Sequence, residues 1–208
     1  MHSIGDRGSV MTVRVRFFFA KRGRAAFLPH VELPPIFVRS ARRAGLEFEY
    51  SEGCVPHPRL SLGPTLPLGI VALEEPAEGW FSSFPADAAA LWGSKFPPGL
   101  EMIEAFPVEG PPLAAVCPRA HYLLRPRRAE DLPSLEEALA MSGGSDARWH
   151  RTSEGLLVTM GSERSMGGVL RAFGEISPGR GWRDVFVVRL RVGPEEGDEV
   201  RSLREVGR

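Results

Sequence analysis

The order of the predicted strands and helices is the feature that most constrains the fold of this chain. In the first half, apolar alternation and helical spacing predict a strand over residues 12–20, a helix over 33–44, strands over 46–50 and 65–73, a helix over 81–95 and a strand over 100–106. In the second half, the predicted elements are a strand over residues 120–125, a helix over 132–141, a hairpin over 147–152 and 155–160, a helix over 166–174 and a strand over 182–192. Both halves therefore follow the order strand–helix–strand–strand–helix–strand.

This doubled order is typical of ferredoxin-like folds, in which split strand–helix–strand units share a sheet. We therefore predict an α+β protein of two tandem ferredoxin-like (βαββαβ) domains with antiparallel sheets. The 208 residues suit two domains of about 100 residues each, and Gly-Pro-Pro at 110–112 indicates a linker. The predicted domains cover residues 11–108 and 117–194, and we expect flexible tails over 1–10 and 195–208.

Positive charge is concentrated in residues 1–60, which hold ten Arg or Lys against five Asp or Glu, whereas residues 61–118 hold one basic and seven acidic residues. Binding to nucleic-acid phosphates needs several such cations on one surface. The arginines that we expect to bind nucleic acid are Arg14, Arg16, Arg39, Arg42, Arg43 and Arg59. The alternative is that the helical arginines form an ordinary solvated face and that the arginine bias reflects a GC-rich genome.

Three consecutive rings, Phe17, Phe18 and Phe19, lie in the first predicted strand. Because successive side chains of a strand point to opposite faces, we expect at least one ring to face away from the core. One common RNA-binding module stacks bases on such a sheet surface, although its own sequence signatures are absent here.

Two prolines bracket a histidine at Pro56-His57-Pro58. They restrict the backbone and remove amide donors, so the imidazole is presented from a stiff loop next to Arg59. Such a histidine could position or protonate a phosphate. The alternative is a histidine that only hydrogen-bonds its own loop. His30 is a second candidate, for which pairing with His57 is weighed against simple packing.

Several classes of site are disfavoured by what the sequence lacks. Cys54 and Cys117 are too few for a disulfide framework or a cysteine zinc site, and the three-cysteine run of a radical enzyme's iron–sulfur cluster is missing. The spacing of His30, His57 and Glu32 matches no metal signature, so we expect no metal and no cofactor in this chain. No apolar run reaches about 18 residues and residues 1–10 lack a signal-peptide core, so we expect no membrane segment and a cytoplasmic location.

Short motifs within residues 13–73 carry a resemblance to a bacterial family. They read Phe-Leu-Pro-His-Val-Glu-Leu at 27–33, Arg-Ser-Ala-Arg-Arg-Ala-Gly-Leu at 39–46, Tyr-Ser-Glu-Gly at 50–53, Pro-His-Pro at 56–58 and Leu-Pro-Leu-Gly at 66–69. Together they resemble the radical-SAM-associated domain of unknown function, which is often fused to, or encoded beside, a B12-binding radical SAM protein. Pro29, Glu32 and Cys54 depart from that pattern, which has Ser, Asp and Phe at these places.

The resemblance implies a separate radical SAM protein as partner and a link to RNA or ribosome metabolism, but no known reaction. The motif residues that it places at the site are Glu32, Tyr50, Ser51, Gly53, Pro56 and Pro58. If the Ser and Asp of the family pattern belong to a hydrogen-bonded site, that site is altered in this chain, which has Pro29 and Glu32 in their places.

We therefore weigh three functions. The leading hypothesis is a non-catalytic accessory module that binds RNA and presents a substrate to an RNA- or ribosome-modifying radical SAM enzyme. The second is a metal-independent endoribonuclease that uses His30 and His57, since CRISPR repeat-processing endoribonucleases have a similar layout. The third is a protein-interaction scaffold.

Overall fold

The computed structural model describes residues 12–197 and 199–206. In this described part, eight strands form one mostly antiparallel sheet: β1 (Val13–Lys21), β2 (Leu60–Leu62), β3 (Val71–Phe81), β4 (Leu100–Pro107), β5 (Arg119–Pro126), β6 (Arg148–Thr152), β7 (Gly155–Gly161) and β8 (Val185–Gly193). A separate hairpin consists of β9 (Glu195–Glu196) and β10 (Glu199–Val200).

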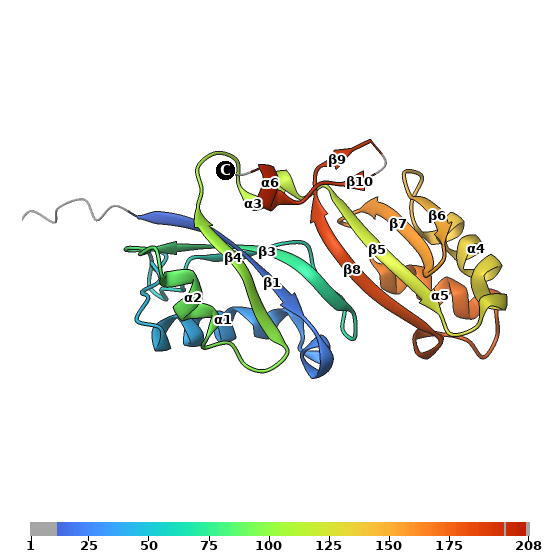
Figure 1. The fold of residues 1–208 in the computed structure, drawn as a ribbon, viewed down its shortest axis with the longest axis horizontal. Coiled ribbons are helices and arrows are strands. Elements are labelled where there is room, and N and C mark those ends of the chain that lie inside the picture. Colours follow the sequence, from blue (N-terminus) through green and yellow to red (C-terminus); the bar gives the residue numbers. More distant parts are fainter. Residues whose placement is uncertain (1–11, 198, 207–208) are drawn as a thin grey trace, which may run out of the picture.

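Helices complete this mixed α+β protein (Figure 1). The six α-helices of the described residues are α1 (Leu33–Arg43), α2 (Ala88–Gly93), α3 (Leu113–Val116), α4 (Leu132–Ser142), α5 (Met166–Ile176) and α6 (Leu203–Val206). Single 3-10 turns are η1 (Gly23–Phe27), η2 (His30–Glu32), η3 (Ala129–Asp131) and η4 (Trp182–Asp184).

The strands are connected in the same way in both halves of the sheet. The overall order is β4-β1-β3-β8-β5-β7-β6, and β2 pairs with β3 beside this path. The first half therefore runs β4-β1-β3-β2 and the second runs β8-β5-β7-β6. The halves join where β3 and β8 pair in parallel through Val71 with Val188 and Ala72 with Arg189. Two separate sheets were expected, but the two halves share one sheet. The reason is that β2 pairs only with the later part of β3, so the first residues of β3 form an open edge with which β8 can pair.

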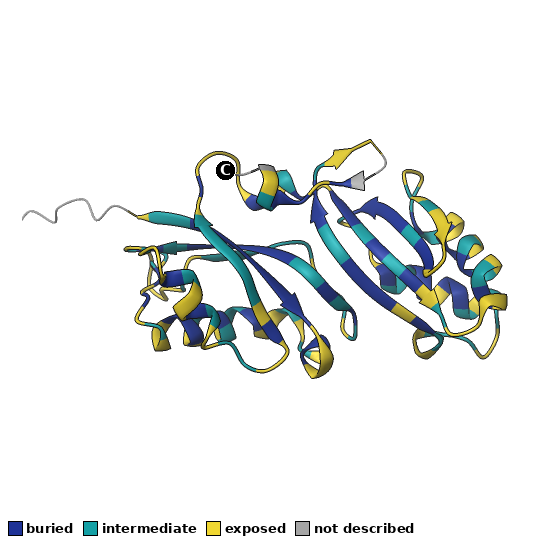
Figure 2. Ribbon diagram, viewed as in Figure 1, coloured by how far each residue is buried: buried dark blue, intermediate teal, exposed yellow. Residues whose placement is uncertain are grey.

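Each half has its own hydrophobic core, and Figure 2 shows buried residues along the strands of both. In the first half, Phe17 and Phe19 of β1 pack with α1 and α2 around Phe37 and Trp92. Phe18 points to the opposite face and joins the core of the second half. The expectation of an exposed ring on this strand is therefore wrong, because both faces of β1 are covered and all three rings are at most 2% exposed.

The elements of the second half match the prediction within a few residues, whereas the first half differs in two places. Residues 46–50 form only isolated bridges, at Phe48 and Tyr50. The strand predicted over 65–73 instead begins at Val71 and continues to Phe81, and α2 covers only the later part of the predicted helix. Glu75 and Glu78 explain the longer strand, since both are buried and ion-paired although their sequence surroundings look like a polar turn.

Two segments that we expected to be irregular are structured. The predicted linker contains α3, whose Leu113 is buried. Residues 195–197 and 199–206 of the predicted tail contain the β9–β10 hairpin and α6, with Val200 and Leu203 fully buried, so these residues pack onto the protein. The other predicted tail, residues 1–10, lies outside the described residues.

Candidate polyanion-binding face

The His57 loop is closed on itself. The backbone amide of His57 donates to Ser51 Oγ at 3.0 Å, and the Ser51 amide donates to the His57 carbonyl at 2.8 Å. Tyr50 bridges to Pro58 across the base of the loop, while Gly53 has a φ of +128° that other residues rarely adopt. The motif residues thus close the loop with hydrogen bonds of its own, and the His57 side chain is exposed at its surface.

His30 lies far from His57. It is half-buried at η2, close to the Lys21 end of β1, where Lys21 Nζ donates to the Leu28 carbonyl at 2.8 Å. The His57 loop lies at the other end of β1, because the Trp80 amide bonds to the Arg59 carbonyl and Trp80 pairs with Arg14 in the sheet. At about 3.3 Å per residue, β1 separates the two ends by about 20–25 Å. The structure therefore does not bring the two histidines together.

The surroundings of His30 disfavour the charged form of its imidazole. Burial, with further contributions from Arg189 and Lys21, lowers the pKa of His30 from its ordinary value of 6.5. Its Nδ1 atom is buried and has no hydrogen-bond partner among the described residues. Glu32, two residues on, is exposed, and its side chain makes no capping bond to α1. His30 therefore faces the interior of the protein, whereas Glu32 faces the solvent.

Three of the six predicted binding arginines interact with the chain itself. Arg16 is buried and ion-paired, with 2.7 Å between its Nη2 and Glu78 Oε1. Arg14 Nη2 donates to the Gly110 carbonyl at 2.7 Å, and Arg59 lies over the Trp80 ring at 5.0 Å. For Arg16 the expected role in nucleic-acid binding is wrong, because its charge is neutralised inside the sheet.

The other three arginines lie on the outer face of α1. Arg39, Arg42 and Arg43 are exposed, while Leu33, Phe37 and Ala41 on the opposite face pack into the core. This division follows from the helical spacing of the apolar residues. Of the salt bridges formed within residues 12–197 and 199–206, none involves these three arginines.

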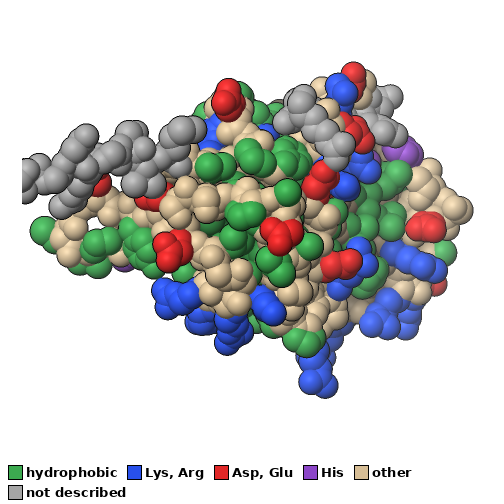
Figure 3. Space-filling view, turned by 60° about the vertical axis from the view of Figure 1, so that its left-hand side comes forward, with side chains coloured by type: hydrophobic (Ala, Val, Ile, Leu, Met, Phe, Trp, Pro, Cys, Tyr) green, Lys and Arg blue, Asp and Glu red, His purple; other side chains and the backbone are tan. Residues whose placement is uncertain are grey.

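Two of these arginines line a hollow of about 430 Å³ together with Arg24 of η1. The other lining residues are Ala25, Leu28, Ile36, Ser40, Pro97 and Pro98. We call this hollow and the exposed arginines of α1 the α1 basic face. In Figure 3, basic side chains gather along the lower edge of the molecule, at the height where α1 and η1 lie in Figure 1. Three guanidinium groups that have neither an ion-pair partner nor a lining carboxylate among the described residues can hold phosphates.

A second, larger groove lies on the other side of η1 and has a volume of about 1210 Å³. One wall is formed by η1 and the turn before β3, and the other by the ends of β5, η4 and β8. Its exposed rings are Phe27, Trp182 and Phe186, which are 67%, 42% and 55% exposed. Its basic residues are Arg125, Arg127 and Arg183, so we call it the aromatic groove.

The aromatic groove could not be predicted from local sequence patterns, because its residues come from four distant segments of the chain. The available signal was in β8, where Phe186 lies between the buried Val185 and Val187 and therefore points to the opposite face. Arg125 pairs with Phe186 in the β5–β8 ladder and lies on that same face.

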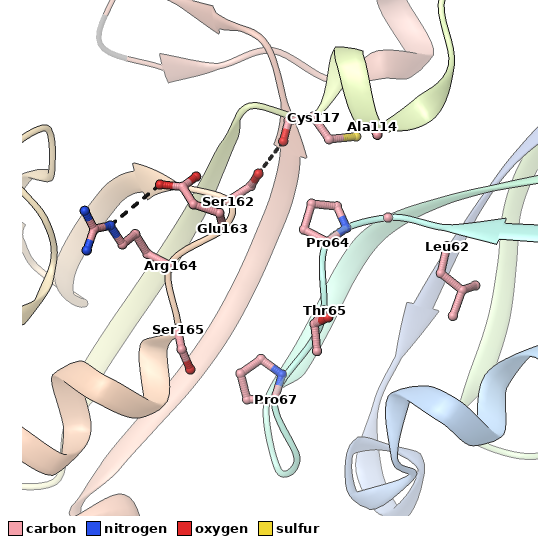
Figure 4. A pocket seen from close by; sticks show the side chains of 11 residues that line it. Leu62, Pro64, Thr65, Pro67, Ala114, Cys117, Ser162, Glu163, Arg164 and Ser165 are labelled. Atoms are coloured by element: carbon pink, nitrogen blue, oxygen red, sulfur yellow. Dashed lines mark hydrogen bonds and ion pairs between the residues drawn. The ribbon is translucent and has the colours of Figure 1, made fainter.

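A third hollow of about 450 Å³ lies between the loop before β3 and the β7–α5 connection (Figure 4). Ser162 Oγ donates to the Cys117 carbonyl, and Ser165 Oγ accepts from the Gly167 amide as the cap of α5. Burial raises the pKa of Cys117 to about 12, so its thiol is not a nucleophile near neutral pH. These polar groups already have partners within the fold, which makes this hollow a weaker candidate.

The interior between the halves holds a buried ion pair. Arg189 of β8 is fully buried, and its Nε donates to Glu75 Oε1 of β3 at 2.7 Å. Its two Nη atoms donate to the carbonyls of Thr65 and Pro64 at 3.1 and 2.8 Å. The pair thus crosses the β3–β8 junction and fixes the turn beside it.

The chain matches a known protein family. The family model described as "Uncharacterized protein conserved in bacteria (DUF2344)" matches residues 14–156, which is more than half of the chain. The chain belongs to this family. The matched range includes the His57 loop, the α1 basic face and the η1 wall of the aromatic groove, but ends before η4 and β8. No curated protein matches the chain.

Two solved structures show a weak likeness to this family member. The acetolactate synthase small subunit from Thermotoga maritima has 13% identity and a TM-score of 0.26, with 89% of this chain and 98% of that chain covered. An unknown protein from Galdieria sulphuraria has 10% identity and a TM-score of 0.29, with 89% and 99% covered. At these TM-scores, neither structure bears on function.

The described part also bears on membrane segments and metal sites. No helix there is long and apolar enough to cross a membrane. Nor do three or more His, Cys, Asp or Glu side chains of those residues come together as metal ligands would.

Proposed function

We propose that this protein is an RNA-binding accessory module and that the α1 basic face holds the RNA phosphates. The observation that carries the proposal is the convergence of Arg24, Arg39 and Arg43 on one hollow that no acidic residue of the described part lines. Arginine suits this role because its planar guanidinium can donate two hydrogen bonds to one phosphate. The separation of His30 from His57 favours binding without cleavage.

Binding of this kind has a salt signature. Each phosphate contact releases counterions, so log K falls with log salt by about 0.7 per contact for single strands and about 0.9 for duplexes. We expect Arg39→Gln/Arg43→Gln to weaken RNA binding roughly tenfold or more at about 0.1 M salt and to flatten the slope by about 1.4–1.8. Fluorescence anisotropy with a labelled RNA measures both quantities.

Arg148→Gln/Arg151→Gln is the matched control. It removes the same charge from the edge strand β6, where the arginines pair with Glu195 and Glu136. Equal losses in both double variants would show that net charge, and not the α1 basic face, governs binding. Undetectable RNA binding by the wild-type protein would refute the proposal.

We also propose that a separate radical SAM protein is the partner to which this module presents its substrate. The support is the set of motifs at 27–33, 39–46 and 50–58, together with membership of a bacterial family. We expect a radical SAM gene beside the genes of family members and co-purification of the two proteins after nuclease treatment. If neither result is found, the proposal of a radical SAM partner is refuted. If a different protein stays bound after nuclease treatment, the scaffold hypothesis is favoured.

We further propose that the two halves are ferredoxin-like domains over residues 11–108 and 117–194. Their shared strand order supports this assignment. An experimental structure in which the halves superpose strand for strand, with both helices of each half on one face, would establish it. Helices on opposite faces would refute it.

A further inference from the structure

We propose that the aromatic groove stacks unpaired bases of a single-stranded nucleic acid, an inference that rests on the RNA-binding function proposed above. The two sites have different roles: the α1 basic face binds phosphates, and the rings of the aromatic groove stack with bases.

The first argument is the exposure of the rings. Phe27, Trp182 and Phe186 come from η1, η4 and β8, yet all line one groove and remain about half exposed or more. Leu68 adds a further apolar side chain that is 55% exposed. Large apolar groups gathered in this way mark a binding surface, because isolated proteins rarely leave them in water.

The second argument is the charge around the rings. Arg125, Arg127 and Arg183 line the groove, and no acidic residue of the described part does. Arg127 Nε donates to the Arg183 carbonyl at 2.6 Å, which ties these two arginines of the groove together. An uncharged apolar helix would match the rings but not three arginines. A chain that alternates planar rings with negative charges matches both, and this is the chemistry of a nucleic acid strand.

The third argument is continuity with the α1 basic face. Arg24 of η1 lines the hollow beside α1, whereas Ala26 and Phe27 of the same turn line the aromatic groove. The Gly69 amide donates to the Ala26 carbonyl at 2.9 Å, so this turn is held to the wall that carries Leu68. A strand can therefore pass over η1 from one site to the other.

The groove volume and the rings together favour a single strand. About 1210 Å³ exceeds the range of roughly 300–1,000 Å³ that is usual for small-molecule sites. In a duplex the base faces are already stacked on one another, whereas the bases of a single strand are free to stack on aromatic side chains.

An abasic strand gives the sharpest test. We compare an oligouridylate RNA with a strand of the same length in which most bases are removed, so that the phosphates are unchanged. Stacking on aromatic side chains contributes about 1–3 kcal/mol per base, so loss of the bases should weaken wild-type binding at least about fivefold. A deoxyoligonucleotide of the same length shows whether the 2′-hydroxyl matters.

Trp182→Leu/Phe186→Leu removes two rings but keeps apolar side chains in place. We expect this variant to bind the base-containing strand at least about fivefold more weakly and to bind the abasic strand like wild type. Quenching of the Trp182 fluorescence by the base-containing strand should be lost with it. Met141→Ala is the control, since Met141 of α4 is an apolar side chain that is 63% exposed but is not among the residues that line the groove.

The outcomes separate this inference from the function on which it rests. If wild type binds both strands equally, with a steep salt dependence, phosphate binding stands and base stacking is overturned. If the ring variant binds the base-containing strand like wild type, the groove is overturned as the stacking site. If neither strand binds, both proposals are refuted.

Discussion

The arginines between the strands and those on α1 carry the same side chain in opposite surroundings. Arg189 and Arg16 are buried, and each is neutralised by a carboxylate of β3. Arg39 and Arg43 are exposed and have no such partner among the described residues. The difference shows that the position of a distant glutamate, and not the local arginine pattern, decides whether an arginine stabilises the fold or is available to a ligand.

The largest effect should come from breaking the interior pair. Glu75→Ala leaves the Arg189 guanidinium buried without its carboxylate, which should lower the free energy of unfolding by about 3–5 kcal/mol. Urea denaturation measures this loss. Glu75→Leu/Arg189→Met removes both charges and should recover most of the stability, because an apolar pair of similar volume fits a buried site. A loss below about 1 kcal/mol in the single variant would show that water reaches the pair.

A smaller effect should appear in the dependence of stability on pH. The folded pKa of His30 is lowered by burial and by Arg189 and Lys21, whereas the unfolded value is near 6.5. The unfolded chain therefore binds this proton first, and stability should fall as the pH drops below about 6.5 until the folded pKa is reached. Thermal unfolding between pH 7.5 and pH 5 tests this.

His30→Gln supplies the reference for that measurement, since glutamine stays neutral throughout the range. The wild type should lose more stability on acidification than the variant. Parallel stability curves for the two proteins would mean that the pKa of His30 is the same in the folded and unfolded chains.

The smallest change is expected on α1. Arg39→Gln/Arg43→Gln should alter the free energy of unfolding by no more than about 0.5 kcal/mol per site, because exposed residues without partners contribute little. The same urea experiment measures this value beside that of Glu75→Ala. A loss as large as that of the interior variant would make these arginines structural and would end the contrast between the two regions.

The fold could be predicted from sequence where each element carries a clear period of its own. The helix α1 is one example, since its buried residues recur at three- to four-residue spacing. The strand β5 is another, since buried positions alternate with less buried ones along it. The continuation of β3 could not be predicted, because Glu75 and Glu78 are compatible with a buried strand only through partners 114 and 62 residues away.

The candidate site was predictable only in part for the same reason. The arginines of α1 could be placed on one face because helical spacing is local. The burial of Arg16 depends on Glu78, and the aromatic groove depends on the pairing of β3 with β8, which brings η1 opposite Phe186. Such long-range pairing leaves no local pattern in the sequence.

The most direct measurement is the affinity of the wild-type protein for an RNA strand across a series of salt concentrations. Contacts from Arg24, Arg39, Arg42 and Arg43 predict a linear fall of log K against log salt with a slope near −2.8, at about 0.7 per single-strand phosphate. A slope near zero, or no binding at about 50 mM salt, would contradict the assignment of these arginines to phosphate binding.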